Sequence, residues 1–247
     1  MIDDIKTMMW KEWREYLSAG GNSRRGNLGV IIFVLIVGIV LPASNKGTAF
    51  LDSPLPIVLY GCYLPIFVII NVVADAFAGE RERHTLETLL ASRLSDRAIL
   101  IGKIAAAVSY GWGLGLVAAV LGAITTNLAH GTGSVRFYPA NMVAGIVFFG
   151  LATATLASTA GCLLSLRAGS VRQVQQMLGV GVMCVVLVPV IGINLLSKSL
   201  RAQLLDKLNQ MGANQIFLLI LIVLAVVDVI LIAVAFARFR RSRLILS

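Results

Sequence analysis

Few residues of this sequence combine into a pattern that could do chemistry. A phosphate-binding loop reads Gly-x-x-x-x-Gly-Lys-Ser/Thr, but the Gly102-Lys103 pair lacks both the upstream glycine and the following hydroxyl. The three cysteines, Cys62, Cys162 and Cys184, all lie inside apolar stretches, where a thiol behaves as a small hydrophobe. An odd number in such places argues against a disulfide framework. We therefore expect no metal site, no redox motif and no ATP chemistry within this chain.

Most of the charged groups that could act together gather in one segment, residues 79–103, here called the charged segment. Within it, Thr85 is placed to cap a short helix, and Ser95 is placed to cap the helix that follows. The short helix would carry Leu86, Leu89 and Leu90 on one apolar face. An exposed apolar face is typical of an interaction surface, although the same face could lie against the bilayer or the rest of the chain.

Polar residues inside apolar stretches are the other candidates for chemistry. Asn71, Asp75, Asn194 and Asp228 are the residues of this kind. Polar groups in hydrocarbon are costly, so they are candidates for a pathway or a pairing. Asp75 lies close to Arg81 and Arg83, and a pairing with either explains it without a pathway. Asp228 lies in the middle of its stretch, where it could pair across helices, bind a cationic substrate or carry a proton.

The composition indicates that a membrane surrounds these candidates. Hydrophobic residues make up 58% of the 247 positions and charged residues 13%, which is too few charges to coat a water-soluble surface. A transmembrane helix needs about 20 apolar residues. Six stretches are near that length: 26–43, 55–78, 104–128, 140–166, 177–196 and 216–237. The sequence therefore predicts an all-α polytopic membrane protein with six transmembrane helices, forming one domain over residues 1–247.

The placement of basic residues predicts the orientation. The formal net charge is +9, but the basic residues lie between apolar stretches and form no single patch, which argues against nucleic-acid binding. Lys and Arg concentrate before the first stretch, in the charged segment, between the fourth and fifth stretches, and after the sixth. By the positive-inside rule these segments face the cytoplasm, and so do both termini. His84 and His130 then fall on opposite sides of the membrane, which argues against a catalytic cluster.

Two segments outside the spans are amphipathic. In residues 1–20, apolar side chains recur at three- and four-residue steps opposite a face of mixed charge. This pattern predicts a helix lying on the cytoplasmic membrane surface, although a docking surface for a partner would look the same. Residues 197–213 continue a leucine stripe opposite charged residues. They predict an extracytoplasmic helix that lies in the outer interface or folds over the bundle.

The run from Asp75 to Lys103 resembles the cytoplasmic loop of the ABC transporter type-2 permease family. The resemblance rests on the acidic-basic run Glu80 to Arg83, on Thr85 to Leu90, and on the entry to the next span: Ser95, Ile99, Gly102 and Lys103. The order of the two amphipathic helices and six spans also fits this family over nearly the whole chain. One departure is Arg93, where many relatives carry proline.

The resemblance implies a permease half-transporter of the inner cytoplasmic membrane, an exporter in which two copies form the pathway. A separate ABC ATPase would bind ATP and Mg, so the chain itself would be no enzyme. The alternatives are an ATP-independent secondary transporter, a membrane enzyme and a membrane-embedded assembly factor. The sequence shows no internal repeats of the kind expected in a secondary transporter and no catalytic cluster of the kind an enzyme needs. The residues implied in ATPase coupling are Glu80, Arg81, Glu82, Arg83, Thr85, Leu86, Glu87, Leu89 and Leu90, and the pathway candidates are Asn71, Asp75 and Asp228.

Overall fold

The computed structural model describes residues 1–17, 24–44, 48–131, 135–195, 200 and 212–239. Within these ranges the chain forms helices and no strands. The predicted all-α class is therefore confirmed. Most of residues 197–213, expected to form the outer amphipathic helix, lie outside the described residues.

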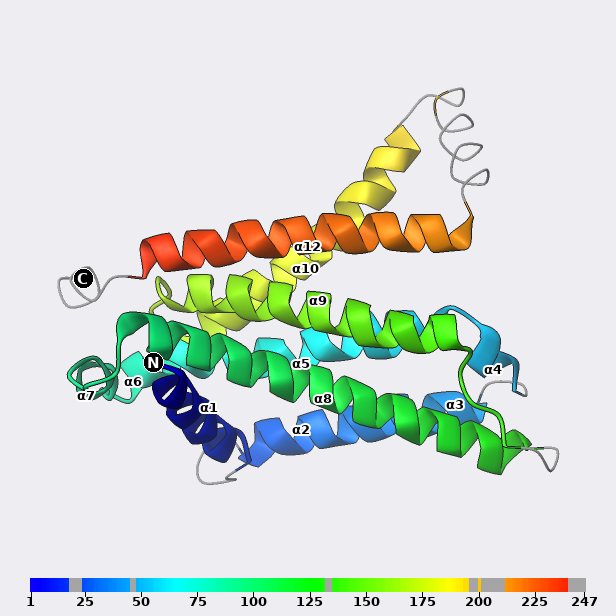
Figure 1. Ribbon diagram of the computed structural model, residues 1–247, viewed down its shortest axis with the longest axis horizontal. Coiled ribbons are helices and arrows are strands. Elements are labelled where there is room, and N and C mark those ends of the chain that lie inside the picture. Colours follow the sequence, from blue (N-terminus) through cyan, green and yellow to red (C-terminus); the bar gives the residue numbers. More distant parts are fainter. Residues whose placement is uncertain (18–23, 45–47, 132–134, 196–199, 201–211, 240–247) are drawn as a thin grey trace.

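Helices follow one another along the whole described chain (Figure 1). Three segments, labelled η, are π-helical and lie within the first two apolar stretches. The elements are α1 (Ile2–Leu17), α2 (Arg24–Leu35), η1 (Ile36–Val40), α3 (Leu41–Ser44), α4 (Ala49–Asp52), η2 (Ile57–Tyr63), α5 (Leu64–Val73), η3 (Asp75–Gly79), α6 (Glu80–Glu82), α7 (Leu86–Leu90), α8 (Asp96–His130), α9 (Ala140–Ser165), α10 (Val171–Leu195) and α12 (Ala213–Arg238).

Four of these helical stretches are long and apolar enough, within the described part of the chain, to cross a membrane. They are Ile57–Glu82, Asp96–His130, Ala140–Ser165 and Gln215–Arg238, and Leu28–Ser44 is a shorter apolar helix. In the order given, these five helices coincide with the second, third, fourth, sixth and first expected spans. The fifth expected span falls on α10, several of whose side chains lie outside the described residues. A multi-pass membrane protein is thus supported, and the count of six stays a prediction.

The long helices lie roughly along one direction, so the bundle has two ends (Figure 1). At one end, here called the α7 end, α1, α6 and α7 lie near the described C-terminal end of α12. At the opposite end, the α4 end, lie α3, α4 and the last turns of α8. The charged segment is therefore at the same end of the bundle as the first helix.

Two apolar cores fill the bundle. The core at the α7 end includes Phe77, Leu86 and Ile99, and the core at the α4 end includes Phe50, Tyr60 and Leu64. Close helix packing makes both possible, because small residues let backbones approach one another. At Gly115, an added Cβ would lie 2.8 Å from the Tyr60 carbonyl oxygen. Small residues also form a buried face of α9, which consists of Gly150, Ala154, Ser158 and Cys162.

Neighbouring helices donate hydrogen bonds to carbonyls of the π-helical segments. A π-helix departs from the regular i→i+4 bonding pattern and is often found at functional sites. In η1, Thr125 donates to the Gly38 carbonyl at 3.4 Å, and in η2, Thr153 donates to the Gly61 carbonyl at 2.7 Å. These bonds tie the first two apolar stretches to α8 and α9.

Candidate coupling site

The second membrane-crossing helix ends in the run Glu80-Arg81-Glu82-Arg83, here called the Glu-Arg-Glu-Arg motif, which forms α6 and the residue after it. Successive residues of a helix point about 100° apart, so four consecutive side chains reach four different directions. Each of these four side chains makes a polar contact within the bundle: Glu80 with α1 and α8, Arg81 and Glu82 with the turn between α9 and α10, and Arg83 with Asp75. The motif is therefore a junction between several helices.

Glu80 is buried in an ion-pair cluster with residues from α1 and α8. Lys103 Nζ lies 2.7 Å from Glu12 Oε1 and 3.3 Å from Glu80 Oε1. The three residues are only 1%, 2% and 3% exposed for Lys103, Glu12 and Glu80. Buried charges persist only when they are paired, and loss of one partner leaves an uncompensated charge. This cluster thus fixes α1, α6 and α8 to one another.

Lys11 closes the cluster from the more exposed side. Its Nζ lies 2.7 Å from Glu80 Oε1 and 2.9 Å from Glu15 Oε1. Burial alone would lower the pKa of Lys11, but the carboxylates of Glu12, Glu80 and Glu15 outweigh it and raise that pKa well above its usual range. Ligand oxygens of these three carboxylates all lie within 4.8 Å of one another, a spacing that could hold a cation. Two ammonium groups lie among them, so the arrangement favours charge compensation by lysine.

The first helix packs on α8 along its length and does not lie apart from the bundle. Met8 is buried, and an added Cβ on Gly102 would lie 2.6 Å from the Met8 Cβ. Further along, Trp13 Nε1 donates to Ser109 Oγ at 2.9 Å. Gly102 therefore has a steric reason to be glycine, because α1 crosses α8 there. The structure places a helix at Ile2–Leu17, within the predicted range 1–20, and the contact of this helix with the membrane surface stays a prediction.

Arg81 and Glu82 hold the turn between α9 and α10. Arg81 donates to the carbonyl oxygens of Leu166 at 3.1 Å and Ala168 at 2.6 Å. Glu82 accepts a hydrogen bond of 2.9 Å from the backbone N–H of Val171, the first residue of α10. The last carbonyls of a helix and its first N–H groups have no partner within the helix. The helix dipole favours a cation near the last carbonyls, as Arg81 is here, and an anion near the first N–H groups, as Glu82 is here.

Asp75 and Arg83 form the pair that the sequence predicts. Arg83 Nη1 lies 2.9 Å from Asp75 Oδ2. Burial would lower the pKa of Arg83, but Asp75, with smaller contributions from Glu15 and Glu80, raises it above its ordinary value. Both side chains are well exposed, so this pair stabilises the fold far less than the buried cluster.

Ser165, the last residue of α9, is a site residue that sequence reasoning missed. Its Oγ accepts hydrogen bonds from the backbone N–H groups of Phe77 at 3.0 Å and Ala78 at 2.9 Å, within η3. It also donates to the Ala74 carbonyl at 3.3 Å. One hydroxyl thus joins the end of α9 to the π-helical turn directly before the Glu-Arg-Glu-Arg motif.

The short helix α7 differs in part from its prediction. Ser95 caps α8 as expected, since its Oγ accepts from Ala98 N at 3.2 Å. Thr85 occupies the N-cap position of α7, but its hydroxyl donates to Glu80 Oε2 at 3.0 Å and caps nothing. The expectation of an exposed leucine face is wrong for Leu86, which is buried in the core at the α7 end, because that core lies directly under the helix.

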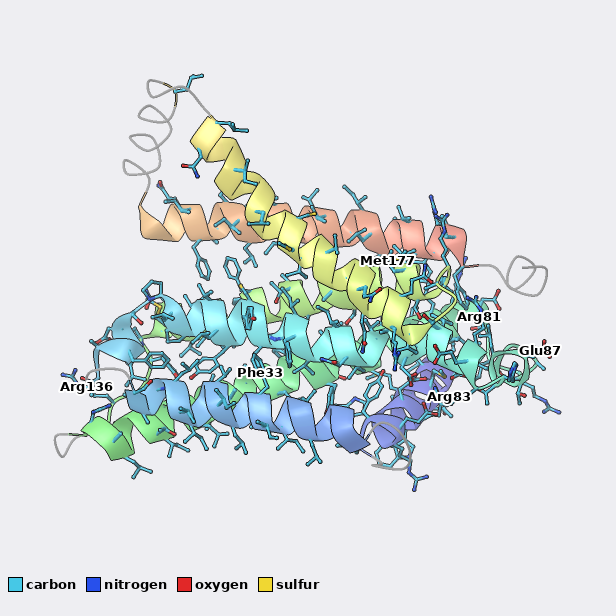
Figure 2. The ribbon with its side chains drawn as sticks, turned by 180° about the vertical axis from the view of Figure 1, so that it is seen from behind. Phe33, Arg81, Arg83, Glu87, Arg136 and Met177 are labelled. Carbon is cyan, nitrogen blue, oxygen red and sulfur yellow. The ribbon has the colours of Figure 1, made fainter. Side chains whose placement is uncertain are left out.

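The outward part of the charged segment is therefore small. Glu87 and Thr88 are exposed, Leu89 is half-buried against the core, and the side chain of Leu90 lies outside the described residues. His84, between α6 and α7, has a φ of 56°, the left-handed conformation that allows the sharp turn. Figure 2 shows Glu87 at the tip of the molecule, with Arg81 and Arg83 nearer the bundle.

A cleft of about 390 Å³ opens between α1 and the charged segment. Its lining comes from α1, α6, α7 and the residues around them: Lys11, Glu15, Glu80, Arg83, Thr85, Thr88, Leu89 and Ser92. The cleft thus adjoins both the buried charge cluster and the outward face of α7.

The remaining pathway candidates lie away from this junction. Asn71 donates to the Phe67 carbonyl of its own helix at 2.8 Å. Asp228 is 7% exposed, and its Oδ1 has no hydrogen-bond partner among the described residues. Asp228 is eleven positions after Phe217, whose ring lies 4.5 Å from that of Phe149, so it falls on the stripe of α12 that faces α9. Their assignment to a pathway stays a prediction.

One comparison with known proteins finds a match. A family model described as ABC-2 type transporter matches residues 3–197, a range that includes nearly all of α1, the Glu-Arg-Glu-Arg motif and α9. A search of curated proteins and a search of solved structures find no match. Since the matched region covers most of the chain, the chain belongs to the ABC-2 type transporter family.

Proposed function

We propose that this chain is the permease subunit of an ATP-driven exporter, in which two copies form the pathway and a separate ABC ATPase binds at the α7 end. The observation that carries the proposal is the junction at the Glu-Arg-Glu-Arg motif. An element that transmits force from an ATPase must be fixed to the bundle and must also present an outward surface. The motif supplies the attachment, and α7 supplies the surface.

The α7 end would face the cytoplasm of a cell with this permease in its inner membrane. Basic residues support that orientation, because Lys and Arg are frequent in cytoplasmic loops. Figure 2 shows Arg81 and Arg83 at the α7 end and Arg136 at the opposite end. With six spans, both termini would lie at the cytoplasmic face.

Within this proposal the coupling residues divide into two groups. Glu80, Arg81, Glu82 and Thr85 contact other parts of this chain, as described above, so they position the segment. The ATPase would contact the outward residues Glu87, Thr88 and Leu89. Leu86 supports α7 from below because it is buried in the bundle core.

The test is association of the ATPase with outward-face variants. Glu87→Lys reverses a charge at an exposed position of α7. We expect ATPase recovery in a pull-down from membranes to fall at least tenfold, because the partner surface would face a like or unpaired charge. Leu89→Asp should act in the same direction. Undiminished recovery with both variants would show that α7 is not the ATPase contact.

The matched control is Arg136→Glu, a charge reversal at an exposed residue of the α4 end (Figure 2). It should insert into the membrane and retain the ATPase as the original chain does. Equal loss with this control would show that the effect comes from general damage to the permease.

A further inference from the structure

The first helix is joined to the charged segment by buried charges and not by apolar contacts alone. One ammonium group, that of Lys103, contacts Glu12 of α1 at 2.7 Å and Glu80 of α6 at 3.3 Å. All three groups are at least nine-tenths buried, so a small separation of these elements would not bring any of them into contact with water. It would leave a charge buried without its partner, which is strongly unfavourable.

Glu80 in turn lies at the base of the α7 turn. The Thr85 N–H donates to the Glu80 carbonyl at 2.9 Å, and the Thr85 hydroxyl donates to Glu80 Oε2 at 3.0 Å. The residue before α7 is therefore bonded twice to the same glutamate that accepts from Lys103. A displacement of α7 acts on Glu80 through these bonds, and on α1 through Lys103.

We propose that Lys103 is a positioning residue that makes α1 move together with the charged segment when the ATPase acts. This inference rests on the proposed function, because the ATPase supplies the displacement. In this arrangement α1 is a moving part of the transporter.

The steric fit at Gly102 supports a rigid connection. A Cβ at position 102 would meet the Met8 side chain and would lie 3.4 Å from the Ile5 carbonyl oxygen. Glycine therefore lets α1 lie directly on α8 beside the residue that holds Glu12. A contact this close, next to a paired buried charge, leaves little room for α1 to slide while the charged segment moves.

The experiment measures distances between spin labels in the permease, reconstituted in nanodiscs with its ATPase partner. Labels are placed at Lys6→Cys on α1, Arg93→Cys in the charged segment after α7 and Leu218→Cys on α12, all exposed positions. The native cysteines are first replaced by alanine. Distances are compared without nucleotide and after trapping with ATP and vanadate.

In the original chain we expect the distance between positions 6 and 93 to stay constant while both positions shift relative to position 218. In Glu12→Gln, which removes the charge that Lys103 holds on α1, position 93 should still shift while position 6 loses at least half of its shift. Lys103→Met should cause at least as large a loss as Glu12→Gln, although it leaves the contact of 2.7 Å between Lys11 and Glu80 in place, and Lys103→Arg should restore the shift. Glu12→Gln keeps the test decisive if Lys103→Met does not insert.

The control is Asp75→Asn, which breaks the exposed pair with Arg83 and should leave both shifts unchanged. The proposal is overturned if position 93 shifts in the original chain while position 6 does not, or if position 6 in Glu12→Gln shifts as it does in the original chain. Failure of the proposed function looks different: no ATPase is retained, and neither position responds to nucleotide.

Discussion

The two ends of the bundle are held together by different kinds of interaction. At the α7 end, three charged side chains are buried together, and backbone groups of helix ends are bonded by Arg81, Glu82 and Ser165. At the α4 end, the core consists of aliphatic and aromatic side chains, with single hydroxyl bonds to carbonyls, as from Tyr60 to Val37 at 3.3 Å. Both ends are well packed, and they differ in the free energy that a small displacement of their helices would cost.

Ion pairs in a dry environment resist separation because each charge needs its partner. Apolar contacts and single hydroxyl bonds can shift with smaller losses, and hydrogen bonds within membranes contribute only about 0.6 kcal/mol on average. The comparison indicates that the α7 end behaves as one body and that the α4 end can adjust. An exporter of the proposed type needs both properties, since force enters at one end and a pathway must change shape at the other.

The largest expected effect is that of Lys103→Met. It leaves Glu12 and Glu80 buried with fewer cations, so we expect a loss of about 3–5 kcal/mol in the free energy of unfolding. Denaturant unfolding of the detergent-purified permease measures it. Arg83→Gln removes the exposed pair with Asp75 and should cost less than about 1 kcal/mol. Equal losses of unfolding free energy for the two variants would show that the buried cluster stabilises the fold no more than the exposed pair does.

The next effect is that of Ser165→Ala, also at the α7 end. It leaves the N–H groups of Phe77 and Ala78 without their acceptor, and a buried unpaired group costs about 1–3 kcal/mol. Thr155→Ala on the same helix is the control, because Thr155 donates only to its own helix, at the Leu151 carbonyl. A fall in the unfolding midpoint no larger than that of the control would contradict the role given to Ser165.

The smallest effect is expected at the α4 end, from Tyr60→Phe. The ring stays buried and the hydroxyl's hydrogen bonds with Val37 and Tyr138 are lost, so the free energy of unfolding should fall by about 0.6 kcal/mol for each bond. Tyr63→Phe, at an exposed ring of the same segment, should have no measurable effect. A loss for Tyr60→Phe that matches Lys103→Met would remove the contrast between the two ends.

Local features of the site could be read from the sequence. Ser95 was predicted as a cap because a cap is formed by residues a few positions apart. Asp75 was predicted to pair with Arg81 or Arg83 because both lie within eight positions of it, and the structure shows the pair with Arg83. The approximate positions of the long helices could also be predicted from local sequence, because the apolar stretches are long and continuous.

The buried cluster could not be predicted in this way. Glu12 and Lys103 are 91 positions apart, so their contact depends on how α1 crosses α8. The periodicity of α1 placed Glu12 on a solvent-facing side, and Gly102-Lys103 served only as a motif. Ser165 resembled any small residue in a packed helix. The π-helical segments have no periodicity signal that separates them from an ordinary α-helix.

The segment η3 has a consequence for how the Glu-Arg-Glu-Arg motif is aimed. It lies directly between α5 and Glu80, and a π-helical turn holds more residues than an α-helical one. Each residue of a helix advances the direction of its side chain by about 100°. Deletion of one residue from η3 would therefore rotate the whole motif by about a quarter turn around its axis, and Arg81 would point where Glu80 now points. The number of residues in η3 therefore sets the direction in which each side chain of the motif points.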